Sequence, residues 1–347
     1  MMAGYLFAFT AVVTLLIGAL LQVMISYLTN ARWFAVLRRC NWLIVSAVPA
    51  TILMVLPLVL GSGALYPWTQ RGVAHSPWLG TPWFILRTAV YIGTWLWCAT
   101  RMRAAAIRQD TGDANTIVAS TRSLRRLSAS GAIAVGVTFT FAGFDWVMSR
   151  DPQWTSTIFG VYLFAGGYLA ALALIALLAL VMPRDSLLGQ AISEQQLAAL
   201  ATLIFMAAML WAYIAFSQFL IIWIGDIPRD ASWLAARAHG VWRAIGFASL
   251  VLQFGLPFFL FLFRPLKQNR RVLAGVATAV LAGHLLDSYW IVGPAAPGTN
   301  LRTATEGIAA LVVLSLVAGA LAFQQRSLWL ALPEGDPDLE AALAYRR

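Results

Sequence analysis

Charged side chains are scarce in this sequence, and it has no polar stretch long enough to form a soluble domain. Only 11% of its 347 residues are charged, whereas 61% are hydrophobic. Soluble globular domains carry about 25% charged residues. The shortage of charge excludes an ordinary soluble protein, and the hydrophobic excess indicates a chain that resides in a lipid bilayer.

Residues that bind common cofactors are almost absent. The two cysteines, Cys40 and Cys98, form no C-x-x-C pair, so ligands for an iron–sulfur cluster or a covalently attached haem are lacking. The sequence also lacks the phosphate-binding G-x-x-x-x-G-K-[ST] motif and the zinc-binding H-E-x-x-H motif. Only His239 and His284 lie near the ends of apolar runs, which leaves one possible pair for a b-type haem. We expect a protein without a redox cofactor or a metal of its own.

Long apolar runs recur along the whole chain. A helix needs about 20 apolar residues to cross roughly 30 Å of hydrocarbon. Nine runs meet this length, and they occupy about residues 5–28, 41–61, 82–100, 128–148, 158–182, 199–224, 241–263, 272–292 and 308–323. The first run is too long for a signal-peptide core and lacks a basic leader, so we expect it to be retained. The sequence predicts an all-α integral membrane protein with about nine transmembrane helices, in one polytopic domain over residues 1–347.

The basic residues separate by side of the membrane. The net charge is +10, yet seventeen of the 24 Lys and Arg residues fall in one set of alternate loops and only five in the other. Positively charged loops stay on the cytoplasmic side during insertion. We therefore predict a periplasmic amino terminus and a cytoplasmic carboxyl terminus. The basic surplus is a topology signal or a lipid head-group site, and it does not indicate nucleic acid.

The polar residues inside the spans are unevenly distributed. Seven ionisable residues fall in the outer halves: Arg87, Asp145, His239, Arg243, His284, Asp287 and Glu306. His284 and Asp287 share a helix face at i, i+3, and His239 and Arg243 share another at i, i+4. An ionisable group at membrane depth costs at least about 2.5 kcal/mol, so such groups usually pair or line a pathway. The seven are candidates for one polar cavity or proton pathway, with anchoring at the interface as the simpler reading.

The stretch FAGFDWVMSRDPQW (residues 141–154) places Asp145 at the last turn of an outward-going helix. Trp146 and Trp154 are expected to anchor this turn at the interface. Asp145 either belongs to this turn-and-anchor arrangement or accepts a proton, and it can pair with an arginine such as Arg87. The catalytic residues, if the chain has any, stay unknown at this level.

Four stretches resemble a known family. They are FAGFDWVMSRDPQWTSTIFGVYLFAG (141–166), WAYIAFSQFLIIWIGDIP (211–228), RPLKQNRR (264–271) and DSYWIVGP (287–294). Together they resemble the polysulfide-reductase membrane-subunit family, also called NrfD-like. Within it they are most similar to the second large membrane subunit of alternative complex III, a quinol:cytochrome c oxidoreductase. The resemblance runs from about residue 20 to the tail.

This resemblance implies an architecture and a set of partners. It implies two four-helix bundles, at about 5–148 and 155–325, a peripheral helix and a cytoplasmic tail at 326–347. It also implies a bacterial inner membrane, a homologous quinol-oxidising membrane subunit, and periplasmic iron–sulfur and c-type haem subunits, with a terminal oxidase as a further partner. Such a subunit has no cofactor of its own, provides a quinone-type cavity in the first bundle, and lets protons leave on the outer side.

The sequence departs from this family branch in two respects, and other functions stay open. The branch usually has ten spans rather than about nine, and it commonly has histidine at the position of Gln153. One alternative is the membrane subunit of a molybdoenzyme-type, polysulfide reductase-like quinone oxidoreductase. An ion-coupled transporter with helices broken at Pro49, Pro57 or Pro257 is another. The last alternative is a scaffold that only anchors partners.

Overall fold

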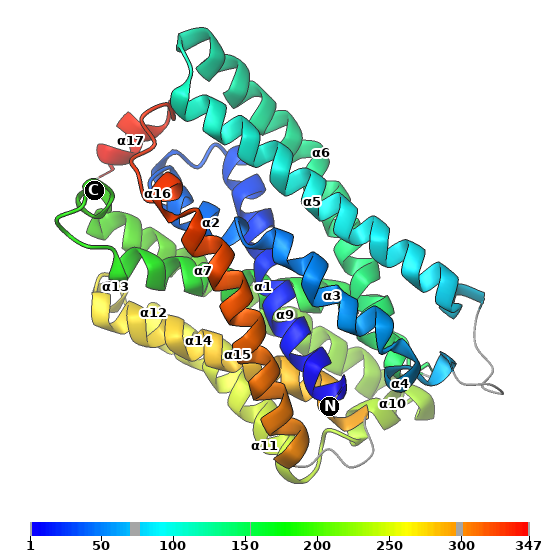
Figure 1. Cartoon of the computed structure of the whole chain (residues 1–347). Helices are drawn as coiled ribbons and strands as arrows, with labels where there is room; N and C mark the ends of the chain where they lie inside the picture. Colours follow the sequence, from blue (N-terminus) through cyan, green and yellow to red (C-terminus); the bar gives the residue numbers. More distant parts are fainter. Residues whose placement is uncertain (1, 70–76, 153, 296–300, 346–347) are drawn as a thin grey trace.

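The chain is all-helical wherever its structure is described. A computed structural model describes residues 2–69, 77–152, 154–295 and 301–345. Gln153 and His75 lie outside the described residues. The helices (Figure 1) are α1 (Met2–Leu28), α2 (Leu37–Val45), α3 (Thr51–Leu60), α4 (Ser62–Leu65), α5 (Thr81–Thr111), α6 (Ala114–Trp146), α7 (Phe159–Val181), α8 (Leu187–Ala191), α9 (Glu194–Gly225), α10 (Pro228–Ala235), α11 (Gly240–Leu250), α12 (Leu256–Phe261), α13 (Arg264–Lys267), α14 (Arg270–Val292), α15 (Leu301–Gln324), α16 (Arg326–Trp329) and α17 (Leu339–Leu343). Short turns of 3-10 helix lie at η1 (Arg32–Phe34), η2 (Val48–Ala50), η3 (Pro67–Thr69), η4 (Pro77–Leu79), η5 (Met148–Arg150) and η7 (Gly293–Ala295), and a π-helical turn lies at η6 (Val251–Gly255).

Eight helical segments in the described ranges are long and apolar enough to cross a membrane. They are Met2–Leu28, Leu37–Leu60, Ala114–Arg150, Phe159–Val181, Glu194–Gly225, Gly240–Phe261, Arg270–Val292 and Thr303–Gln324. These segments agree with eight of the nine expected spans and confirm a multi-pass, all-α membrane protein. The remaining expected span, 82–100, lies within the 31-residue helix α5, which carries Arg87 and is not among the eight.

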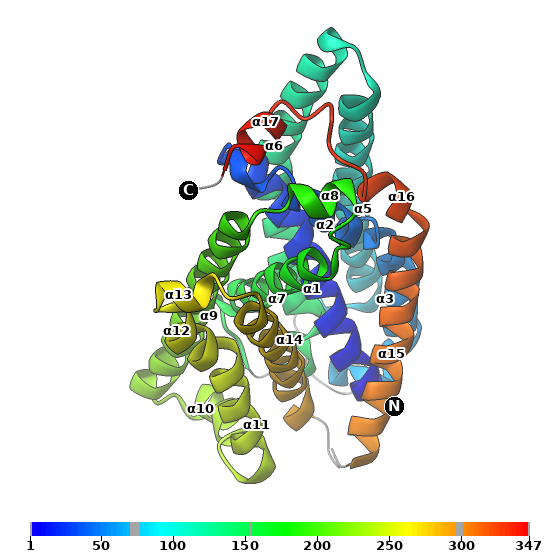
Figure 2. The same ribbon diagram turned by 90° about the vertical axis from the view of Figure 1, so that its left-hand side faces the viewer.

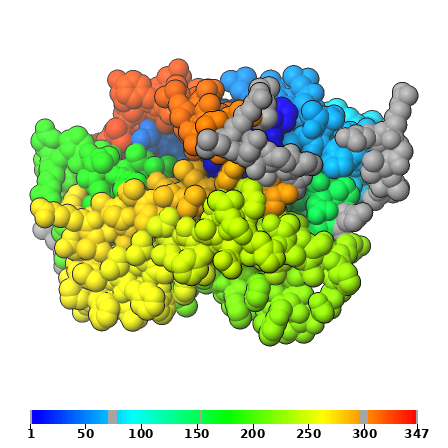
Figure 3. All heavy atoms as spheres, turned by 90° about the horizontal axis from the view of Figure 1, so that it is seen from below, coloured from blue at the N-terminus to red at the C-terminus, as the bar shows by residue number. Residues whose placement is uncertain are grey.

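Helix α1 is the most deeply buried span and packs in the middle of the others. It contacts α6, α7, α14 and α15, and in Figure 3 the orange residues of α15 lie beside the blue start of α1. Helix α5 packs along α6, while α7 packs against α9 and α14. Because α1 contacts helices of both halves of the chain, its role is to join them. The division into two four-helix bundles stays a prediction.

The contact between α1 and α7 depends on glycine. A Cβ atom on Gly167 would lie 2.3 Å from the carbonyl oxygen of Thr14, and a Cβ on Gly18 would lie 2.6 Å from the carbonyl oxygen of Gly167. Both distances are far below van der Waals contact, so the two backbones touch. Small residues allow such close approach between membrane helices, where packing replaces the hydrophobic effect as the attractive force.

The three prolines expected to break helices act differently. Pro49 lies in the 3-10 turn that separates α2 from α3, whereas Pro57 lies inside the continuous helix α3. Pro257 directly follows the π-helical turn Val251–Gly255. Proline has no amide hydrogen and its ring meets the carbonyl four residues earlier, here that of Gln253, which accounts for the widened turn.

Helices α5 and α6 form a long hairpin that extends beyond the rest of the molecule at the top of Figure 2. At about 1.5 Å per residue each helix is roughly 46–50 Å long, well over the thickness of a hydrocarbon core. Asp113 caps α6 by accepting a hydrogen bond from the amide of Thr116 at 3.0 Å. The Thr116 hydrogen bonds lower the pKa of Asp113, so the cap stays charged near the positive end of the helix dipole.

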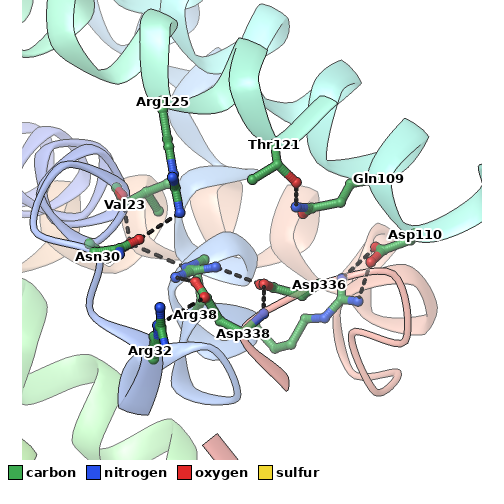
Figure 4. A network of polar contacts seen from close by, with 12 residues as sticks. Val23, Asn30, Arg32, Arg38, Gln109, Asp110, Thr121, Arg125, Asp336 and Asp338 are labelled. Carbon is green, nitrogen blue, oxygen red and sulfur yellow. Dashed lines mark hydrogen bonds and ion pairs between the residues drawn. The ribbon is translucent and has the colours of Figure 1, made fainter. Parts of the chain in front are cut away.

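The carboxyl-terminal tail is docked against the start of α2. The side chain of Arg38 is only 2% exposed, and its guanidinium pairs with Asp336 at 2.5 Å and Asp338 at 3.7 Å (Figure 4). Arg39 makes a two-bond pair with Asp110 of α5, with both distances 2.8 Å. The predicted cytoplasmic tail, 326–347, is therefore part of the packed structure over its described residues, because it supplies the counter-charge to a buried arginine.

We expect Asp336→Ala to lower the free energy of unfolding by about 3–5 kcal/mol, since it leaves the Arg38 charge buried without its closest partner. Thermal unfolding of the purified protein in mild detergent measures the effect, and limited trypsin digestion should then cut the tail faster. Glu340→Ala is the matched control because Glu340 is exposed. Equal unfolding of both variants would show that the tail does not stabilise the bundle.

Substituting Gly167 should separate α1 from α7. We expect Gly167→Ala to cost about 1–3 kcal/mol of unfolding free energy, the usual range for overpacking. Gly136→Ala is the control, because a Cβ atom on Gly136 meets no heavy atom within 4 Å. The unfolding free energies of the two variants can be compared by denaturant titration in detergent. A Gly167→Ala protein as stable as the control would contradict the close contact.

Candidate functional site

Asp145 is fully buried, with 0% exposure, and is compensated by an arginine. Arg87 of α5 donates two hydrogen bonds to its carboxylate, from Nε at 2.7 Å and from Nη2 at 2.9 Å. The Tyr91 hydroxyl donates a third at 2.7 Å, and the Trp78 indole donates a fourth at 3.0 Å. The Trp78 ring also covers the Arg87 guanidinium, 4.0 Å from its centre. The pairing of Asp145 with Arg87 is thus observed, and it balances the buried charge.

The two tryptophans beside Asp145 are not interfacial anchors. The expectation was wrong because the turn folds inward and buries both rings. Trp154 stacks on Trp233 with ring centres 4.2 Å apart, and Trp146 meets Trp95 edge to face at 5.6 Å. Aromatic pairs of this geometry stabilise a core beyond their buried area. The turn after α6 is therefore held by packing inside the protein.

Asp287 is the second buried carboxyl group, with 4% exposure, and it has no cationic partner. The Tyr162 hydroxyl of α7 donates a hydrogen bond to it at 2.5 Å, and the side chains of Trp211 and Gln253 lie against it. In the described part of the chain, no Lys, Arg or His side chain bonds to this carboxyl group. A buried carboxyl group without a counter-charge is suited to holding and releasing a proton.

His284 lies one turn before Asp287 but faces α1. Its Nε2 atom is 3.1 Å from both the carbonyl oxygen of Ala11 and the hydroxyl oxygen of Thr14. A carbonyl oxygen can only accept a hydrogen bond, so Nε2 carries the hydrogen. The other ring nitrogen, Nδ1, has no hydrogen-bond partner among the described residues and lies near Gly166 of α7.

The seven residues singled out from the sequence do not share one pocket. Arg87 and Asp145 form one cluster between α5 and α6, while His284 and Asp287 belong to another around α14. His239 and Arg243 are exposed at the start of α11, and Glu306 lies on α15. Within the described residues no hydrogen bond or ion pair joins the first two clusters. The expected convergence is not seen in these contacts, because the Asp145 side chain bonds to α5 whereas that of Asp287 faces Tyr162 of α7 and Trp211 of α9.

Two arginines that the sequence places in outer loops are buried above Asp287. Arg237 donates hydrogen bonds to the carbonyl oxygens of Trp290 at 3.1 Å and Ile291 at 2.6 Å, and Arg150 donates to the carbonyl oxygen of Val292. They cap the carboxyl end of α14, where the helix dipole is negative. Burial, together with the neighbouring charge of Arg150, lowers the pKa of Arg237 to about 9, so it stays charged at neutral pH.

Sequence analysis missed Tyr162 and these two arginines. Tyr162 lies within an apolar run and Arg150 within a turn motif, so neither spacing indicates a partner. The one available signal was that the carboxyl end of α14, a few residues after Asp287, is the negative end of the helix dipole. This end favours a nearby positive charge.

Pockets lie beside both clusters. One of about 340 Å³ is lined by Asp145, Trp78, Phe141 and Met148. Another of about 380 Å³ extends from His284 towards the inner half between α1, α7, α14 and α15. In the described ranges, no three His, Cys, Asp or Glu side chains gather as metal ligands.

Neither the protein-family models nor the curated proteins contain a match to this chain.

Breaking the Arg87–Asp145 pair should be costly. We expect Arg87→Gln to lower the unfolding free energy by about 3–5 kcal/mol, because it leaves a buried carboxylate uncompensated. The double variant Arg87→Leu/Asp145→Leu should recover most of this loss, since it removes both charges. Arg243→Gln, an exposed arginine, is the control for charge removal. Thermal unfolding in detergent gives all three values. A double variant that is no more stable than Arg87→Gln would contradict a coupled pair.

Proposed function

We propose that this chain is a membrane subunit of a respiratory quinol:cytochrome c oxidoreductase of the alternative complex III type. It carries no redox cofactor of its own and serves the release of protons to the outer side. The observation on which the proposal rests is the buried, uncompensated carboxyl group of Asp287, held by the Tyr162 hydroxyl at 2.5 Å near the outer end of α14.

The partners of Asp287 support this family reading. Tyr162, Trp211 and Asp287 come from three of the four stretches that resemble the NrfD-like family, and Asp145 belongs to the first of them. Residues from three stretches that are far apart in the sequence thus meet around one carboxyl group. Structural packing alone does not require a carboxyl group here, because an uncompensated polar group in a membrane interior costs free energy.

In the proposed complex, this chain and its partner subunits carry out different parts of quinol oxidation. Oxidation of a quinol to a quinone releases two electrons and two protons. In the proposed complex the electrons pass to iron–sulfur and c-type haem centres of periplasmic subunits. This chain supplies groups that accept a proton and pass it outward, with Asp287 and Tyr162 as the titratable pair. Arg150 and Arg237 bond to the carbonyl oxygens at the carboxyl end of α14, so the Asp287 carboxyl group keeps no cationic partner.

Substitutions of the pair test the role in proton release. We expect Asp287→Asn and Tyr162→Phe to slow quinol oxidation by the intact complex about tenfold or more, without dispersing its subunits. His284→Ala should also slow it, and Asp145→Asn should have a smaller effect because Arg87 already compensates that charge. Asp226→Asn is the matched control, since Asp226 is exposed at the outer end of α9.

Two measurements can overturn the proposal. Purification of the native chain in mild detergent should yield iron–sulfur and c-type haem proteins with it, and a chain that purifies alone and stays active contradicts a subunit role. In vesicles containing the complex, protons should appear outside. Proton uptake from the inner side that disappears with Asp287→Asn would make the chain a pump instead.

One observation favours an ion-coupled transporter as a second candidate. The π-helical turn at Val251–Gly255 interrupts a span and brings Gln253 against Asp287. Transporters bind ions where helices are interrupted near charged groups. Solute or ion flux by the purified chain alone in vesicles would favour this candidate over the redox subunit.

A further inference from the structure

We propose that a pocket on the outer side, between the end of α6, the start of α7, α9 and α10, binds the head group of an ethanolamine phospholipid. This pocket adjoins the one lined by Asp145, with which it shares Phe144, Met148 and Thr155, but neither Asp145 nor Asp287 lines it. The inference does not depend on the function proposed above.

The pocket has an apolar wall that faces the lipid side. Its volume is about 370 Å³, and Phe144, Met148, Ile221 and Ile227 line it. The side chains of Ile221 and Ile227 are exposed, at 65% and 52%. Exposed isoleucines at the outer end of a membrane-spanning helix contact lipid chains, so the pocket is open to a molecule that arrives from the outer leaflet.

Two oxygen acceptors in the pocket lack hydrogen bonds. Gln218 is only 8% exposed, and its Oε1 atom has no partner among the described residues. The Oδ1 atom of Asp230 likewise accepts no hydrogen bond, although the Nε atom of Arg229 lies 3.6 Å away. A buried acceptor without a hydrogen bond costs about 1–3 kcal/mol, so Gln218 Oε1 calls for a donor from outside the chain. Asp230 Oδ1, which is ion-paired with Arg229 but not hydrogen-bonded, can accept a hydrogen bond as well. A carboxylate beside an amide oxygen favours a cationic donor.

The opposite side of the pocket offers hydrogen-bond donors. Thr155, Ser156, Thr157 and Ile158 line it and lead directly into α7. Ile158 is the N-cap of this 23-residue helix, and no side chain caps it. The first-turn amides of a helix have no acceptor within it, and together with the helix dipole they attract an anion such as phosphate.

These two ends match a zwitterion with a hydrogen-bearing cation. The ammonium group of ethanolamine carries three N–H donors for Gln218 and Asp230, and its phosphate fits the hydroxyls and the uncapped end of α7. The trimethylammonium group of choline has no N–H donor, so the two acceptors would stay unpaired. A glycerol head group has hydroxyls but no cation to match the Asp230 carboxylate. The acceptor pair therefore selects ethanolamine among these three.

Native mass spectrometry of the full chain with defined lipids tests this selection. The probes are phosphatidylethanolamine, phosphatidylcholine and phosphatidylglycerol with identical acyl chains, each titrated into the delipidated protein. We expect phosphatidylethanolamine to bind about tenfold more tightly than phosphatidylcholine, the equivalent of one charge-assisted hydrogen bond. Equal affinity for the three lipids would overturn the proposal.

Variants assign the selectivity to this pocket. Gln218→Leu and Asp230→Asn should each remove most of the tenfold preference, while Gln324→Leu and Asp185→Asn, both exposed on the inner side, should retain it. If Gln218→Leu unfolds in detergent without lipid, the partly exposed Asp230→Asn decides alone. A preference that survives in Asp230→Asn would place the lipid elsewhere and overturn the site.

Discussion

The backbone contact between α1 and α7 is the constraint on which the rest of the structure depends. It exists because Gly18 and Gly167 have no side chains, so the carbonyl oxygen of Thr14 lies where a Cβ atom on Gly167 would be. The same approach brings Thr14 and Ala11 within hydrogen-bond distance of His284 on α14. A larger residue at either glycine would push α1 away and leave His284 without these partners. Packing of two glycines thus sets the environment of a buried histidine on a third helix.

Compensation of buried charges is the second constraint on this fold, and the buried charged groups are compensated in different ways. Arg38 with Asp336 and Arg87 with Asp145 are close, buried pairs. Arg150 and Arg237 are instead satisfied by the carbonyl oxygens at the end of α14. Asp287 alone among the buried carboxyl groups described here combines deep burial with the lack of a cationic partner. That difference separates it from the structural ion pairs.

The candidate site was only partly accessible from the sequence. Asp145, His284 and Asp287 were found because ionisable residues in apolar runs are rare. Arg87 was named as a partner of Asp145 because the two opposite charges fall near the same ends of their predicted spans. Tyr162 and Arg237 were not found, because a tyrosine in an apolar run and an arginine in a loop are ordinary there. The bond between Tyr162 and Asp287 joins residues 125 positions apart, and no local pattern encodes that distance.

The sequence by itself determined the class of the protein and the position of eight spans, because these depend only on local hydropathy. The direction of the spans, which follows from loop charge, stays a prediction. Tertiary structure alone decided which polar residues meet. It separated Asp145 from Asp287, turned Trp154 inward and docked the tail onto Arg38. The physical reason is that hydropathy is a property of each segment, whereas pairing depends on the angle at which two helices pack, and small residues such as Gly167 set that angle.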